Sequence, residues 1–243
     1  MLAKFNLYDF IADIIPGITF IWVIERIFVA FGRTSPFPAS GQIAETSVLI
    51  VLGYLCGLML QALSETVTEK QALLRIWKGF PSERFLLPGD DTFSDEKKRH
   101  IVQLAASRFG VAADVVIPEG LPPEREEHLR RSKNREIFSL CYHYVDGLSP
   151  RPQIFNAQYG LFRCLITLFA LLLILSFPVT WGLWSGPPQQ NVMLLLMPTT
   201  FLILGWLSYV RCHKRSHDFA RSVYDLFISG TGAPTKKPNT EKE

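Results

Sequence analysis

Four long apolar stretches constrain the fold of this 243-residue chain more than any motif it carries. Two lie near the N-terminus, at about residues 10–31 and 48–63, and two lie near the C-terminus, at about residues 161–184 and 192–210. Each approaches the length that a helix needs to cross ~30 Å of hydrocarbon at a rise of ~1.5 Å per residue. We therefore expect an all-α fold with four transmembrane helices.

Between the two pairs lies a polar segment, residues 64–159, which we expect to form a helical insert. The chain is 48% apolar, which is ordinary for a soluble protein, but its apolar residues are concentrated in the four stretches. Thr92 or Ser94 can cap a helix over residues 95–109, and a charged helix follows over about 124–145. So short an insert buries a modest core alone, and we expect a helical collar on the roots of the spans.

After the fourth stretch the chain continues as an amphipathic helix, with Phe219, Val223 and Phe227 on one side. This face can pack on the insert or along the inner lipid surface, and the sequence leaves both possibilities open. The last residues have the composition of a disordered tail. The predicted domains are an N-terminal membrane hairpin (1–63), the insert (64–159), a C-terminal membrane hairpin (160–210), the amphipathic helix (211–229) and the tail (230–243).

Positive charge flanks the predicted spans almost entirely on one side. The residues concerned are Lys70, Arg75, Lys78, Arg151, Arg163, Arg211, Lys214, Arg215 and Arg221. The connection between the first two stretches has only Arg33, and the connection between the last two has no basic residue. Basic flanks stay in the cytoplasm. We therefore predict a multi-pass protein of the bacterial inner (plasma) membrane with the insert and both termini inside. Arg211, Lys214 and Arg215 are expected to form a juxtamembrane basic anchor on the lipid bilayer.

Five residues of the first stretch are candidates for a pore, a gate or an intersubunit contact: Asp13, Pro16, Gly17, Glu25 and Arg26. Charges inside spans are costly and are usually functional or paired, and a proline favours a kink. A plainer interpretation stays open for the charges. Glu25 and Arg26 can extend to the outer interface, and Asp13 can be a helix-start acid in the headgroup region.

Gly53 and Gly57 in the second stretch have the small-xxx-small spacing that lets helix backbones approach closely in lipid. We expect this face to pack against another helix. Assembly as a homo-oligomer through the second span and the cytoplasmic collar follows as a hypothesis.

Enzymatic chemistry has no positive support in the sequence. There is no glycine-rich phosphate loop, no G-x-S-x-G and no H-E-x-x-H motif, so neither a cofactor nor a metal is expected. Cys212, His213 and His217 lack a further ligand at metal spacing. Arg211 and His217 are similar to the Arg-x(4–6)-His pattern of HEPN ribonucleases, which keeps a membrane-bound nuclease as an alternative. The net charge of +3 is too small to indicate direct nucleic-acid binding.

Two motifs support a family resemblance. The opening Leu7-Tyr-Asp-Phe-Ile-Ala-Asp-Ile-Ile-Pro-Gly17 and the segment Phe155-Asn-Ala-Gln-Tyr-Gly-Leu-Phe-Arg163 flank this layout of spans and insert. The chain resembles small bacterial membrane proteins of anti-phage systems, including membrane subunits of two-component defence systems and CRISPR-associated membrane accessories. The resemblance implies an oligomeric membrane protein that senses infection or permeabilises the membrane, controlled by a cytosolic protein partner on the insert. A non-conducting scaffold or assembly adaptor is the alternative.

Overall fold

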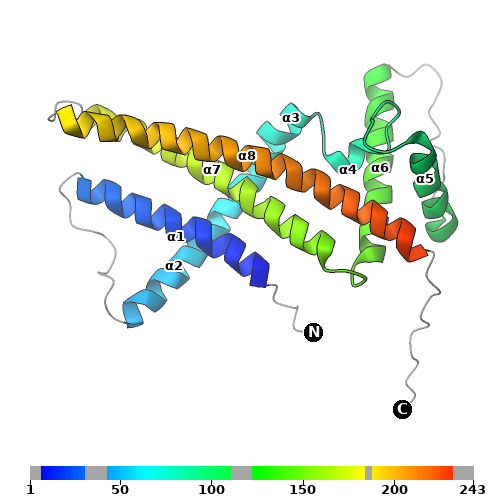
Figure 1. The fold of residues 1–243 in the computed structure, drawn as a ribbon, viewed down its shortest axis with the longest axis horizontal. Helices are drawn as coiled ribbons and strands as arrows, with labels where there is room; N and C mark the ends of the chain where they lie inside the picture. Colours follow the sequence, from blue (N-terminus) through cyan, green and yellow to red (C-terminus); the bar gives the residue numbers. More distant parts are fainter. Residues whose placement is uncertain (1–6, 31–42, 111–121, 184–187, 232–243) are drawn as a thin grey trace, which may run out of the picture. The chain divides into compact units, whose positions relative to one another are not determined.

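The computed structural model describes residues 7–30, 43–110, 122–183 and 188–231, with side chains over 12–29, 46–110, 122–177 and 196–230. Every regular element in these ranges is helical, which confirms the predicted all-α class (Figure 1). The predicted tail lies outside the described residues beyond Thr231, as do residues 32–42 and 185–187 of the two connections between paired stretches. The chain divides into two compact units, Met1–Lys78 with Ile154–Arg215, and Gly79–Gln153 with Ser216–Glu243.

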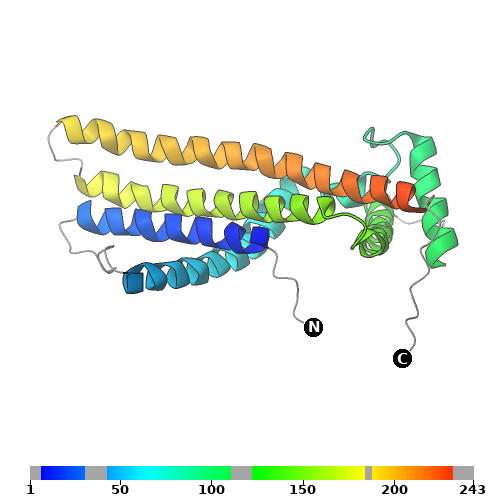
Figure 2. The same cartoon turned by 60° about the horizontal axis from the view of Figure 1, so that its bottom comes forward.

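The first unit contains the apolar helices. Its elements are α1 (Leu7–Ala30), α2 (Ile43–Leu63), the π-helix η1 (Ser64–Leu73), α3 (Leu74–Trp77), most of α7 (Arg151–Leu183) and the larger part of α8 (Pro188–Thr231). α1 and α2 cross each other in Figure 1, and α1, α7 and α8 run side by side in Figure 2. Val23, Leu60 and Leu168 belong to a core that joins α1, α2 and α7, with Phe201 of α8 packed against it.

The second unit has a hydrophobic core of its own. It is built from α4 (Pro81–Arg84), α5 (Asp95–Phe109), α6 (Pro123–Val145) and the last part of α8. Ile101 of α5 and Ile137 of α6 pack in this core with Val223 and Phe227 of α8. The sequence left two locations open for the amphipathic face of the C-terminal helix, and in the structure that face packs on the helices of the insert.

Local capping chemistry sets the ends of α5. Ser94, rather than Thr92, is the N-cap, and its hydroxyl accepts a hydrogen bond from the Lys97 amide at 3.3 Å. Gly110 ends the helix in the left-handed conformation that glycine adopts without strain. The predicted bounds of 95–109 are therefore confirmed. The sequence does not predict α4, because the segment after Phe80 begins with a proline and has the composition of a loop.

Two helical stretches, Thr46–Arg84 and Arg151–Phe177, are long and apolar enough to cross a membrane. They contain the second and third predicted spans. The described part of α1 carries Asp13, Glu25 and Arg26, and the side chains of α8 are described only from residue 196, so neither helix adds a candidate among the described residues. The structure thus supports an all-helical chain with two candidate spans.

Candidate functional site: a buried ion pair on a π-helix

The helix that leaves the second apolar stretch changes its winding at Ser64. From Ser64 to Leu73 it is a π-helix, and α-helical winding resumes in α3. Hydroxyl side chains occur densely here. The Ser64 hydroxyl donates to the Gln61 carbonyl at 2.8 Å, and the Thr66 hydroxyl donates to the Ala62 carbonyl at 3.1 Å. Such bonds compete with the backbone ladder and loosen α-helical geometry, and π-helical turns occur often at functional sites.

π-winding decides which side chains of η1 are buried. Ser64, Thr68 and Leu73 are its buried residues, at spacings of four and then five. An α-helix of 3.6 residues per turn would not keep the five-residue step on one face. Trp77 of α3 continues the same buried face, and its indole nitrogen donates to the Tyr209 hydroxyl of α8 at 3.1 Å.

A buried ion pair holds η1 to α7. The Arg163 guanidinium donates to the Glu69 carboxylate, and only 11% and 12% of the two side chains are exposed. The Arg163 Nε also donates to the Ser64 hydroxyl at 3.2 Å, and the Tyr159 hydroxyl donates to Glu69 Oε2 at 3.1 Å. Both charges therefore have several partners, which a buried ion pair requires to offset its desolvation.

The polar contacts continue along α7 and reach α8. The Thr68 and Thr167 hydroxyls lie 2.6 Å apart in a hydrogen bond. The Cys212 thiol of α8 donates to the Tyr159 carbonyl at 3.9 Å. Burial raises the pKa of Cys212 to about 12, so this thiol stays neutral at physiological pH. The network joins η1, α7 and α8 through polar groups that form hydrogen bonds with one another.

This arrangement has the chemistry of a conformational lock. Its carboxylate is paired with arginine and tyrosine, its hydroxyls are paired with each other or with backbone carbonyls, and its cysteine is a neutral thiol. Neither a nucleophile with a base nor an anion cradle emerges from it. Among the described residues, no group of three His, Cys, Asp or Glu could hold a metal ion.

The predicted glycine pair lies where α1 and α2 cross. A Cβ atom on Gly17 would overlap the Gly53 carbonyl oxygen, and one on Gly57 would overlap the Asp13 carbonyl oxygen. The close-packing face of α2 thus contacts α1 of the same chain. It is covered in this arrangement and is not a free surface for a second copy.

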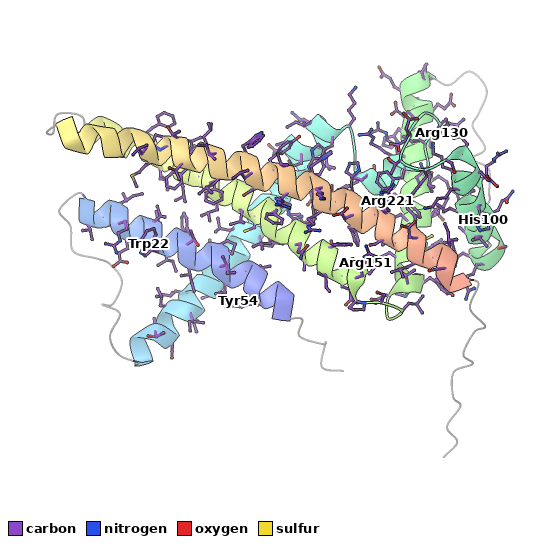
Figure 3. All side chains as sticks on the ribbon, in the orientation of Figure 1. Trp22, Tyr54, His100, Arg130, Arg151 and Arg221 are labelled. Carbon is purple, nitrogen blue, oxygen red and sulfur yellow. The ribbon has the colours of Figure 1, made fainter. Side chains whose placement is uncertain are left out.

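The remaining candidates of α1 do not form one site. Pro16 is buried beside the crossing, and Asp13 contributes its backbone to it. Arg26 is exposed, with its guanidinium carbon 5.4 Å from the ring centre of Trp22, which Figure 3 labels on α1. Glu25 is half-buried, and three helical turns separate it from Asp13.

The basic cluster on α8 is only partly solvated. Arg211 and Lys214 are exposed, whereas the Arg215 guanidinium carbon lies 5.4 Å from the ring centre of Phe155 on α7. The two histidines pack on aromatic rings in different units. His213 meets Trp77 at 5.1 Å between ring centres, and His217 meets Phe85 at 5.2 Å.

Sequence reasoning missed the Glu69–Arg163 pair. It counted Arg163 as an orientation signal and did not single out Glu69. The available signal was an arginine two residues inside the predicted third span, because such a charge requires a partner. The partner lies 94 residues away in the chain, so spacing could not identify it.

No protein-family model, no curated protein and no solved structure matches this chain.

Proposed function

We propose that the chain is a four-span inner-membrane protein whose second unit, with both termini, lies in the cytoplasm. The observation that carries this proposal is the outward apolar surface of α2 and α7. Only 17% and 33% of the residues in their most apolar windows are buried within the chain. Met59 and Ile174 are 74% and 64% exposed. Water would make such surfaces aggregate, whereas lipid matches them.

The first and last helices support two further spans. Trp22, Phe28 and Val29 of α1 are exposed, as are Leu202 and Trp206 of α8. These residues belong to the same unit as α2 and α7, so one apolar environment would cover all of them. The charges of α1 lie near its two ends, where side chains can reach the headgroups.

We further propose that the protein serves in anti-phage defence, as a membrane component controlled by a cytosolic protein docked on the second unit. The support is the predicted layout, in which the chain resembles small defence membrane proteins, together with a second unit that has its own core. α8 supplies residues to both units, up to Arg215 in one and from Ser216 in the other. A partner that binds the α8 part of the second unit would thus contact the same helix that packs in the membrane unit.

Two observations favour the scaffold alternative. The small-residue face of α2 is covered by α1, and the buried polar side chains around Glu69 bond to one another. Neither feature supplies a polar lining for a water-filled path. Pore formation would therefore require a different arrangement of the helices or a lining contributed by several subunits.

Topology is tested by cysteine labelling in intact cells. Ser40→Cys is expected to react with a membrane-impermeant maleimide from outside, and His100→Cys on the exposed side of α5 (Figure 3) only after permeabilisation. The unaltered protein measures background from the native cysteines, three of which are buried. External labelling of His100→Cys without labelling of Ser40→Cys would reverse the proposed orientation.

Function is tested in cells that carry the gene with its chromosomal neighbours. We expect phage plating to fall relative to cells that lack this chain, and a voltage-sensitive dye separates the two mechanisms. A pore depolarises the membrane during infection, and a scaffold protects without depolarisation. Equal plating with and without the chain, across a broad phage panel, would refute the defence role.

A further inference from the structure

The π-helix η1 ends beside a second unusual backbone feature. Lys78, directly after α3, has φ 54° and ψ 42°, a left-handed conformation that side chains with a Cβ rarely adopt. Lys78 is also the last residue of the first unit, and Gly79 is the first residue of the second. Two disfavoured conformations therefore lie in the stretch that leads from one unit into the other.

The winding of η1 fixes the direction in which α3 faces. In an α-helix, at ~100° per residue, Leu73 would lie about 140° around the axis from Thr68, and Trp77 about 180°. In the structure all three are buried, and Trp77 bonds to Tyr209 of α8. A return to α-helical winding would carry Leu73 off the buried face and Trp77 away from Tyr209 of α8.

The contacts that oppose this return come from α7. Arg163 reaches both Ser64 at the start of η1 and Glu69 in its middle, and Thr167 bonds to Thr68. Since long π-helices are rare and poorly favoured by themselves, these tertiary contacts are what hold the winding. The ion pair is the strongest of them, because separating it would leave a charge buried without its partner.

We propose that η1 is a winding switch. The Glu69–Arg163 ion pair holds it in the π-helical form, and opening of that pair converts it to an α-helix and turns α3 by about half a turn. The rotation of α3 would change the direction in which the chain leaves the first unit at Lys78 and enters the second at Gly79. This device goes beyond the proposed defence role and does not depend on it.

The switch is tested by the reactivity of single cysteines in the full-length protein in mild detergent. Ala72 is exposed and Leu73 is buried, and rewinding exchanges their positions. Ala72→Cys and Leu73→Cys are labelled with a maleimide and quantified at each site by mass spectrometry. In the presence of Glu69→Gln, labelling at 72 is expected to slow and labelling at 73 to accelerate, which shifts their ratio by about tenfold or more.

Glu65→Gln is the matched control, because Glu65 lies on the same segment and pairs with Lys70 on the surface. It should leave the labelling ratio unchanged. If Glu69→Gln does not fold, Glu69→Gln with Arg163→Gln leaves no unpaired charge and should give the same shift. An unchanged ratio in a variant with a normal gel-filtration profile, or an equal change in Glu65→Gln, would overturn the proposal.

Discussion

The Tyr224 hydroxyl of α8 donates a hydrogen bond at 3.0 Å to the Ser82 carbonyl of α4, 142 residues earlier in the chain. The ring of Tyr224 is completely buried, between Phe93 at 5.9 Å and Phe138 at 5.5 Å between ring centres. One side chain thus fills the core of the second unit and satisfies a backbone carbonyl at its edge. The C-terminal helix is therefore an integral part of this unit.

Replacing Tyr224 with phenylalanine should destabilise the second unit by about 1–2 kcal/mol, because the Ser82 carbonyl loses its buried donor while the ring is kept. Native-state amide hydrogen exchange in α5 and α6 measures the opening of this unit. Tyr144→Phe is the control, since the Tyr144 hydroxyl forms a longer bond of 3.3 Å to Gly230. Equal losses of stability in the two variants would show that the hydrogen bond to Ser82 does not stabilise the unit more than the bond to Gly230 does.

The sequence predicts helices well where their limits depend on local chemistry. The bounds of α5 follow from a serine N-cap and a C-terminal glycine, and its core residues Ile101 and Ala105 follow from helical spacing. The helix also continues from the second apolar stretch to Trp77, and the sequence contains no helix breaker before Gly79.

Features that depend on distant contacts could not be predicted in this way. The π-winding of η1 and the Glu69–Arg163 pair arise from packing against α7, and spacing along the chain does not encode such contacts. Gly53 and Gly57 indicate a close helix contact, but their spacing cannot distinguish α1 from a second copy of the chain as the partner. Similarly, an amphipathic face alone does not distinguish lipid from a protein core.

Gly17→Ala should disrupt the crossing of α1 and α2. The added methyl group would overlap the Gly53 carbonyl, so the helices must separate, at a cost of about 1–3 kcal/mol or more. Thermal unfolding in mild detergent, followed by fluorescence-detected gel filtration, measures the loss. Gly205→Ala is the control, because its methyl group would meet Phe169 at an ordinary 3.6 Å, and helix propensity should leave it neutral or slightly stabilised. A stable Gly17→Ala protein would contradict the close crossing.

The buried thiol of Cys141 should make the second unit sensitive to alkali. Burial raises its pKa from 9.0 to about 12, so the folded state favours the neutral thiol. This contribution to stability is complete below pH ~9 and is lost as the pH rises from there towards the folded-state pKa. Burial raises the pKa of Tyr224 as well, and its contribution has the same sign.

Hydrogen exchange in α6 between pH 9 and 11, corrected for the intrinsic rate, should therefore report falling stability, with a shallower fall in Cys141→Ala. Alkylation supplies a second measurement. Cys141 in the folded chain should stay unreactive at pH 9, whereas the urea-unfolded chain should react readily. Rapid native-state alkylation of Cys141 at pH 9 would contradict a buried, neutral thiol.

Glu83→Gln should destabilise the second unit far more than Glu136→Gln. The Glu83 side chain is only 7% exposed and accepts from Arg135 Nε at 2.8 Å, while the Asn134 amide donates to the Glu83 backbone carbonyl at 2.8 Å. Glutamine keeps the shape but removes the charge that Arg135 meets. We expect a loss of about 1–3 kcal/mol, since charged hydrogen bonds exceed neutral ones in strength.

Glu136 offers the matched comparison, because its carboxylate pairs with Lys133 on the same helix and is mostly exposed. Its substitution should change stability by no more than about 0.5 kcal/mol. Hydrogen exchange in α5 and α6 measures the free energy of opening of the second unit in both variants. Because Glu83 links α4 to Arg135 of α6, its substitution should also let the α4 backbone exchange before the rest of the unit. Uniform exchange across the unit would show that the Glu83–Arg135 contact does not hold α4 in place.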